Sequence, residues 1–179
     1  MRGSSVGAFG LRLPPWRAQG AVAQSQRRGG GPLNGRIHDN RLSSNGTQSM
    51  RGIAIYPQGA TITRVYANRV SGNVGNGITF FPGNANFAHQ FDAVNNAVDC
   101  NGAPGFPIGI FPIRSVDGSV ATQILNNTVV GCYTGITVGN AGSSGPLSGR
   151  IANNIVAYNH FGLTLGGLDG IITNDHNLL

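Results

Sequence analysis

Apolar and polar residues alternate over short stretches along most of the chain, and turn-forming residues separate these stretches. Five stretches place apolar residues at the first and third of three positions: residues 53–55, 78–80, 108–110, 136–138 and 163–165. Alternation over so few residues predicts short β-strands rather than helices. The pattern therefore indicates an all-β chain.

An asparagine motif repeats along the same part of the chain. Each of five full copies has Asn first, an apolar residue third, and Asn or Cys sixth. The leading residues, with the start of a sixth copy, are Asn40, Asn68, Asn96, Asn127, Asn154 and Asn177, spaced 28, 28, 31, 27 and 23 positions apart. Short strands at such a period predict the coils of a parallel solenoid, in which equivalent residues stack about 4.8 Å apart.

Stacking gives the recurring amide a physical role. An Asn side chain offers both a donor and an acceptor, so amides on successive coils can bond to one another. Asn also tolerates the left-handed backbone that a tight corner needs. Three positions before the first five Asn stand apolar residues that we expect to fill the interior: Ile37, Val65, Ala93, Ile124 and Ile151.

With these copies, residues 35–179 resemble the right-handed parallel β-helix repeat proteins of the pectate-lyase-like superfamily. The resemblance implies a single-stranded right-handed parallel β-helix of about five to six coils. It also implies polysaccharide as the substrate class. The superfamily includes lyases, hydrolases, epimerases and non-catalytic scaffolds, and a fold alone does not choose among them.

The charge is divided unevenly along the chain. Residues 1–34 contain five Arg and no acid, whereas residues 35–179 contain seven Arg and six Asp. We interpret residues 1–34 as a disordered basic leader rich in Gly, Pro and Arg. The near-neutral body argues against nucleic-acid binding, because a basic footprint belongs on the folded part.

The sequence also bears on location. No run of eighteen apolar residues is present, so we expect no membrane span. Ala21-Val22-Ala23 resembles a signal cleavage site without the apolar stretch that normally precedes one. We expect an extracellular or periplasmic location.

One outward column of the predicted solenoid is basic. Arg36, Arg64 and Asp92 each lie four positions before a leading Asn. Arg pairs with carboxylates through two parallel hydrogen bonds, so this column suits an acidic sugar. Arg41 and Arg69, one position after their Asn, extend the basic area.

A second outward column adds candidate bases. His38 and Tyr66 lie two positions before their Asn. Either one can remove a proton next to a sugar carboxylate, while Arg64 neutralises the developing charge. The alternative is a solvated face in which Arg64 pairs with Asp92.

Aromatic residues follow three of the short strands. Tyr56, Phe81 and Phe111 are each followed by Pro, and an exposed aromatic column is a plausible surface for stacking sugars. The alternative is that neighbouring loops cover these rings as a small second core.

Other chemistry is disfavoured. The six Asp fall at different repeat positions, which argues against a carboxylate-pair hydrolase and a calcium-dependent lyase. We expect no metal site and no cofactor. Cys100 and Cys132 are one position out of register, so we expect their side chains to diverge and Cys132 to be a buried free thiol.

Two functions follow. The first is an exported protein that binds or acts on an acidic polysaccharide through the residues named above. The second is a non-catalytic scaffold or adhesion module, and whether the protein is an enzyme stays open. Because the sequence stops partway into a new coil at Leu179, we expect either a longer β-helix or self-association end to end.

Overall fold

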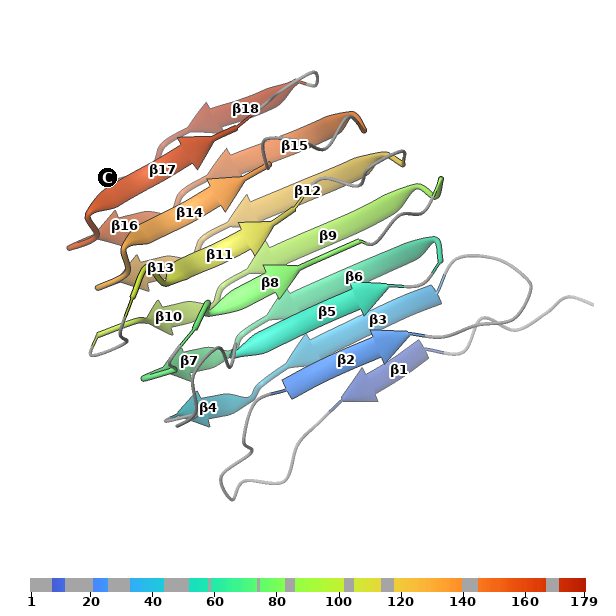
Figure 1. Cartoon of the computed structure of the whole chain (residues 1–179), viewed down its shortest axis with the longest axis horizontal. Coiled ribbons are helices and arrows are strands. Elements are labelled where there is room, and N and C mark those ends of the chain that lie inside the picture. Colours follow the sequence, from blue (N-terminus) through green and yellow to red (C-terminus); the bar gives the residue numbers. More distant parts are fainter. Residues whose placement is uncertain are drawn as a thin grey trace, which may run out of the picture.

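The computed structural model describes residues 8–11, 21–25, 33–43, 52–57, 59–73, 75–82, 86–101, 105–113, 118–139, 145–166 and 171–179. Every regular element within these residues is a β-strand, and all of the pairs between strands are parallel. The strands stack into three sheets that run the length of the molecule (Figure 1). The predicted all-β parallel solenoid is confirmed.

The first sheet has seven strands. In spatial order they are β1 (Ala8–Leu11), β3 (Leu33–His38), β6 (Thr61–Tyr66), β9 (His89–Val94), β12 (Val120–Leu125), β15 (Leu147–Ala152) and β18 (Ile172–Asp175).

The second and third sheets have five and six strands. The second sheet contains β16 (Ile155–Ala157), β13 (Thr128–Val130), β10 (Ala97–Asp99), β7 (Arg69–Ser71) and β4 (Arg41–Ser43). The third sheet contains β17 (Phe161–Leu165), β14 (Thr134–Val138), β11 (Ile108–Pro112), β8 (Ile78–Phe80), β5 (Ile53–Pro57) and β2 (Ala21–Ser25).

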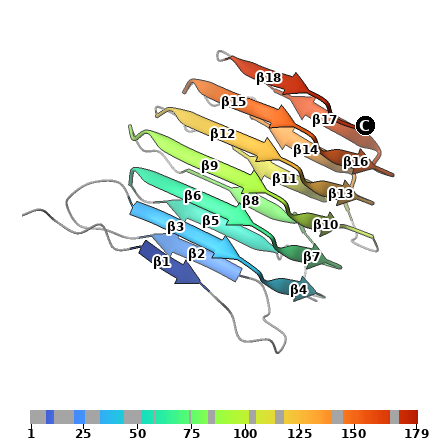
Figure 2. The ribbon, with the colours of Figure 1, turned by 180° about the vertical axis from the view of Figure 1, so that it is seen from behind.

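Each coil visits the third, first and second sheets in that order, as β5, β6 and β7 do (Figure 2). From β4 to β16 the chain makes about four turns, slightly fewer than the expected five to six coils. After β16 the chain adds β17 and β18, and the sixth motif copy adds only a single bridge between Ile155 and Leu178.

Two strands lie wholly within residues 1–34, and β3 begins there at Leu33. The backbone of β1 pairs with β3, and that of β2 pairs with β5, where Ala21 lies opposite Ile53. The expected disordered leader otherwise lies outside the described residues. Ala21-Val22-Ala23, which resembles a cleavage site, is thus placed in a strand.

The interior is built from columns of one residue per coil. The five apolar residues expected before the Asn positions are all buried, at 0–2% exposure. In the third sheet the equivalent column contains Ile53, Ile78, Ile110 and Ile136. Burial of such a column is the main force that holds coils together, because no coil buries its apolar face alone.

A glycine column makes room for this packing where each coil enters the third sheet. It contains Gly52, Gly77, Gly109 and Gly135. A Cβ at Gly77 would overlap both the Val98 side chain and the carbonyl oxygen of Gly109. Only the smallest residue fits between the second and third sheets at this point.

The six leading Asn form the corner between the first and second sheets, which we call the amide corner. The side-chain Nδ2 of each of the first five donates to Oδ1 of the next Asn at 2.8–3.0 Å. The backbone N–H of each Asn donates to the same Oδ1 at 2.9–3.1 Å. From Asn68 onward, Nδ2 also donates to a carbonyl oxygen of the preceding coil at 2.9 Å. The predicted Asn column is therefore confirmed as a continuous hydrogen-bonded ladder.

The left-handed residue of this corner is not the ladder Asn. It is the residue before it, with φ between 51° and 57°, at Asp39, Ala67, Asn95, Asn126, Asn153 and His176. Our expectation for the Asn itself was wrong, since the ladder requires its side chain to point into the corner while the preceding residue makes the bend.

The corner between the second and third sheets is less uniform, and we call its residues Asn73, Cys100, Cys132 and Asn159 the mixed corner. The Cys132 backbone N–H donates to Asn159 Oδ1 at 2.8 Å, as in the amide corner. Cys132 is bonded to Cys100 through a disulfide with a Cα–Cα distance of 4.8 Å.

The disulfide corrects our expectation of diverging side chains and a free thiol. Gly72 and Gly131 adopt left-handed backbone after β7 and β13, at φ of 61° and 67°, whereas Cys100 after β10 does not. The different backbone turns the Cys100 side chain into the corner. Cys100 is the fifth residue of its motif copy and Cys132 the sixth, and this turn brings the two sulfur atoms together despite the offset of one position.

His89 lies inside the solenoid at the start of β9 and is 3% exposed. Its Nδ1 lies 3.1 Å from Thr61 Oγ1, and its ring meets Phe80 edge to face. Burial lowers the pKa of His89, because a charged imidazole would lose its hydration. The neutral form therefore occupies the interior.

Candidate ligand-binding face

The outward side chains of the first sheet form straight columns across the coils. Arg36, Arg64, Asp92, Gln123 and Arg150 are successive partners in register. His38 pairs with Tyr66 in the next column. Register therefore brings together the five first-sheet candidates predicted from the sequence: Arg36, His38, Arg64, Tyr66 and Asp92.

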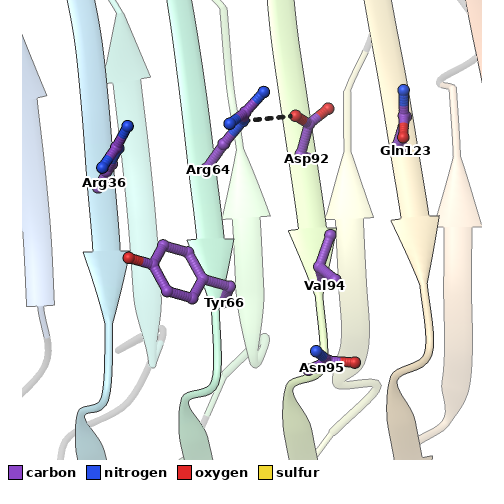
Figure 3. A pocket seen from close by; sticks show the side chains of 7 residues that line it. All are labelled: Arg36, Arg64, Tyr66, Asp92, Val94, Asn95 and Gln123. Carbon is purple, nitrogen blue, oxygen red and sulfur yellow. Dashed lines mark hydrogen bonds and ion pairs between the residues drawn. The ribbon is translucent and has the colours of Figure 1, made fainter.

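These residues border an open cleft of about 420 Å³ on the outer surface (Figure 3). The residues that line it are Arg36, Arg64, Tyr66, Asp92, Val94, Asn95 and Gln123. In Figure 3 the Tyr66 ring extends from β6 toward β3, below Arg36. The sequence prediction missed Val94, Asn95 and Gln123, although Gln123 follows Asp92 in the same column.

One ion pair crosses this cleft. Arg64 Nε donates to Asp92 Oδ2 at 3.2 Å, with the Arg64 side chain 55% exposed and Asp92 7% exposed. Gln90 Nε2 donates to both carboxylate oxygens, at 3.0 and 3.2 Å. Asp92 is therefore held on two sides, and an exposed partner such as Arg64 adds little stability by itself.

Arg36 differs from Arg64 in its partners. Among the described residues Arg36 forms no ion pair or hydrogen bond through its side chain, and it is exposed. With Arg36 and Arg64 against Asp92, the lining of the cleft has one excess positive charge. The cleft thus presents a guanidinium that is available to an anion.

His38 lies beside the cleft rather than in its lining. Its ring stacks on Tyr66 with centroids 4.7 Å apart and planes inclined by 8°. Its Nδ1 is 2.7 Å from Asp39 Oδ2. The stack fixes the Tyr66 ring, so the arrangement gives His38 a positioning contact with Tyr66.

A second hollow of about 390 Å³ adjoins the first on the same sheet. Its lining residues are Gln90, Asp92, Ala121, Thr122, Gln123, Gly149 and Arg150. At its far side Arg150 Nη2 donates to Asp175 at 3.0 and 3.3 Å. We did not predict this hollow, although Arg150 occupies the same repeat position as Arg36 and Arg64.

The remaining candidates lie on other sheets. Arg41 and Arg69 are exposed partners in β4 and β7 of the second sheet, past the amide corner. They do not extend the lining of the cleft.

The expected aromatic column is only partly formed. Tyr56 and Phe81 lie close on the third sheet, with ring centroids 6.0 Å apart, and Phe81 is 40% exposed. Phe111 pairs with Thr79 instead of following Phe81. We expected residues 108–110 to align with residues 78–80, position by position. This register was wrong, because Gly109 belongs to the glycine column and Ile110, not Ile108, aligns with Ile78.

An aromatic cluster that the sequence prediction missed lies near the mixed corner. Tyr133 contacts Phe106, His160 and Phe161 at centroid distances of 4.6, 4.9 and 5.4 Å. Phe106 is 74% exposed. The signal in the sequence was an aromatic ring two residues before Gly135 and Gly162.

Two searches bear on other kinds of site. Among the residues that the structure covers, no three His, Cys, Asp or Glu side chains gather as metal ligands would. Nor does that part of the chain contain a helix long and apolar enough to span a membrane.

Comparisons of the chain with models of known families, with curated proteins and with solved structures find no match. The parallel β-solenoid is therefore established by the structure, while the superfamily suggested by the Asn motif is not. Function must be argued from the outer face of the first sheet.

Proposed function

We propose that the protein binds an acidic polysaccharide on the outer face of the first sheet, without cleaving it. The observation that carries the proposal is the exposed guanidinium of Arg36, which has no partner among the described residues and lies beside the Tyr66 hydroxyl group in an open cleft (Figure 3). A guanidinium fork matches the geometry of a carboxylate. The amides of Gln123 and Asn95 supply donors and acceptors for sugar hydroxyl groups.

The lining of the cleft supports binding over catalysis. Hydrolysis by a carboxylate pair needs two carboxyl groups on either side of the scissile bond. Asp92 is the single carboxylate in the described lining of both hollows, and Arg64 and Gln90 hold it. Of the two candidate bases for removal of a proton next to a sugar carboxylate, His38 lies outside the lining of the cleft.

The disulfide supports a location outside the cytosol. Structural disulfides persist in oxidising compartments. The Cys100–Cys132 bond is buried, with each residue 4% exposed. A protein in an extracellular or periplasmic location can encounter polysaccharides, so the proposed location agrees with the proposed ligand.

Affinity electrophoresis tests the proposal. Hyaluronan and polygalacturonate should retard the protein, and neutral dextran of similar length should not. Arg36→Ala should weaken retardation about tenfold, as expected for loss of one charge-assisted contact. Arg69→Ala is the matched control, because it removes an exposed Arg from the second sheet and should leave retardation unchanged.

Two outcomes would refute the proposal. One is equal retardation by dextran, and the other is retardation that Arg36→Ala leaves unchanged. Ultraviolet absorbance is followed in the same mixtures, since unsaturated sugar products would show cleavage and contradict a purely binding role.

A further inference from the structure

The two hollows on the first sheet are parts of one groove. They share Asp92 and Gln123 as a common wall. Together their lining extends from Arg36 on β3 to Arg150 on β15, which are four strand steps apart. At about 4.8 Å per step, the groove is about 19 Å long. That length suits a chain of several sugar units lying along the solenoid axis.

The charge along this groove is not uniform. Arg36 and Arg64 stand at one end and Arg150 at the other. The centre contains the Asp92 carboxylate and the neutral Gln123 amide. An anion placed at the centre would be repelled by Asp92, whereas a hydroxyl group there can donate to it.

We propose that this groove selects polysaccharides in which acidic units are separated by neutral ones. The inference rests on the proposed function and adds the kind of polymer. Acidic units meet the Arg residues at the two ends, and neutral units between them donate hydroxyl groups to Asp92 and Gln123.

The pair between Arg150 and Asp175 is compatible with this arrangement. The two side chains are 53% and 37% exposed, so their ion pair is well solvated. An exposed pair contributes little free energy. A ligand carboxylate can therefore share or replace Asp175 at Arg150 without a large loss.

Titration calorimetry with oligosaccharides of defined length tests the groove. Hyaluronan oligosaccharides alternate acidic and neutral units, and oligogalacturonates of equal length are acidic throughout. We expect affinity for the hyaluronan series to rise with length until the chain spans the groove. Arg150→Gln should weaken the longest hyaluronan oligosaccharide about tenfold and leave the shortest unchanged. Arg69→Gln is the matched control.

A second variant tests the selectivity directly. Gln123→Arg places a cation at the neutral centre, on an exposed position where the fold tolerates the change. It should raise affinity for the oligogalacturonates several-fold and remove the preference for hyaluronan.

The outcomes separate the two proposals. If both series bind in an Arg36-dependent way, but neither length nor Arg150→Gln matters, the groove is wrong and the proposed function stands. A wild-type preference for oligogalacturonates would overturn the selectivity. If neither series binds at any length, the proposed function fails and this inference with it.

Discussion

The two corners of the solenoid solve the same problem with different chemistry. The amide corner uses one residue type in all six positions, and each side chain bonds to the next. The mixed corner uses Asn73 and Asn159 in two coils, and Cys100 and Cys132, joined by a disulfide, in the two coils between them. In a stack of identical amides, every side chain is needed to continue the row of hydrogen bonds. In a mixed stack, a covalent bond can take the place of one hydrogen bond.

The largest expected effect comes from the middle of the amide corner. Asn96→Ala removes the acceptor of the Asn68 backbone N–H and side chain, and the donor to Val65 and Asn127. Several buried polar groups then lack partners, so we expect the free energy of unfolding to fall by about 3–5 kcal/mol. Chemical denaturation followed by circular dichroism measures it.

Asn95→Gly is the matched control for this variant. Asn95 is exposed and left-handed at φ 55°, a conformation that glycine adopts readily, so its replacement should be nearly neutral. A loss below about 1 kcal/mol at Asn96 would mean that water replaces the ladder bonds.

The mixed corner should respond to its covalent bond. The disulfide closes a loop with a sequence separation of 32. Replacing both Cys by Ala should lower the free energy of unfolding by about 3–4 kcal/mol, because the unfolded chain gains conformational freedom. Denaturation of the wild-type protein with and without reductant checks the same quantity. Unchanged stability under reductant would contradict the assignment of the bond.

A second substitution in that background would sharpen the comparison. With Cys100→Ala, we expect Cys132→Asn to be more stable than Cys132→Ala by about 1–2 kcal/mol. The amide can donate to Asn159 Oδ1, which already accepts the backbone N–H of residue 132. This change converts one step of the mixed corner into the chemistry of the amide corner.

The smallest expected effect concerns the bend of the amide corner. Ala67 holds φ at 54°, a region that costs an alanine about 1–2 kcal/mol. Ala67→Gly should raise the free energy of unfolding by about 0.5–1 kcal/mol, after the entropy of the more flexible unfolded chain is subtracted.

The control is Ala97→Gly. Ala97 is exposed in extended backbone of β10, where glycine should lower stability by about 0.5–1 kcal/mol. Thermal denaturation of both variants gives the sign of each change in stability. A loss of stability in Ala67→Gly would show that the bend carries no strain.

Much of the fold follows from the sequence because one motif recurs with little variation. The spacing of the Asn residues gives the register of the first two sheets, including Arg36 against Arg64. The third sheet was harder to predict, because Ile108-Gly109-Ile110 alternates as well as any strand. The pair Gly-Ile at 52–53, 77–78, 109–110 and 135–136 is the better marker, and it reflects packing between sheets.

The site could be predicted as a column but not as a hollow. The repeat placed Arg36, Arg64 and Asp92 on one line. The hollows also have lining residues such as Val94 and Ala121, and these become recognisable only once the strands are side by side. The disulfide was missed for a related reason, since a backbone change at Cys100 altered where its side chain points.

The ladder of the amide corner also has a direction. Each Oδ1 accepts from the Asn of the preceding coil, so all the side-chain carbonyl groups point toward the earlier coils. Parallel dipoles aligned head to tail polarise one another and strengthen together. The solenoid therefore contains a polar axis outside its backbone, with its positive end toward the later coils.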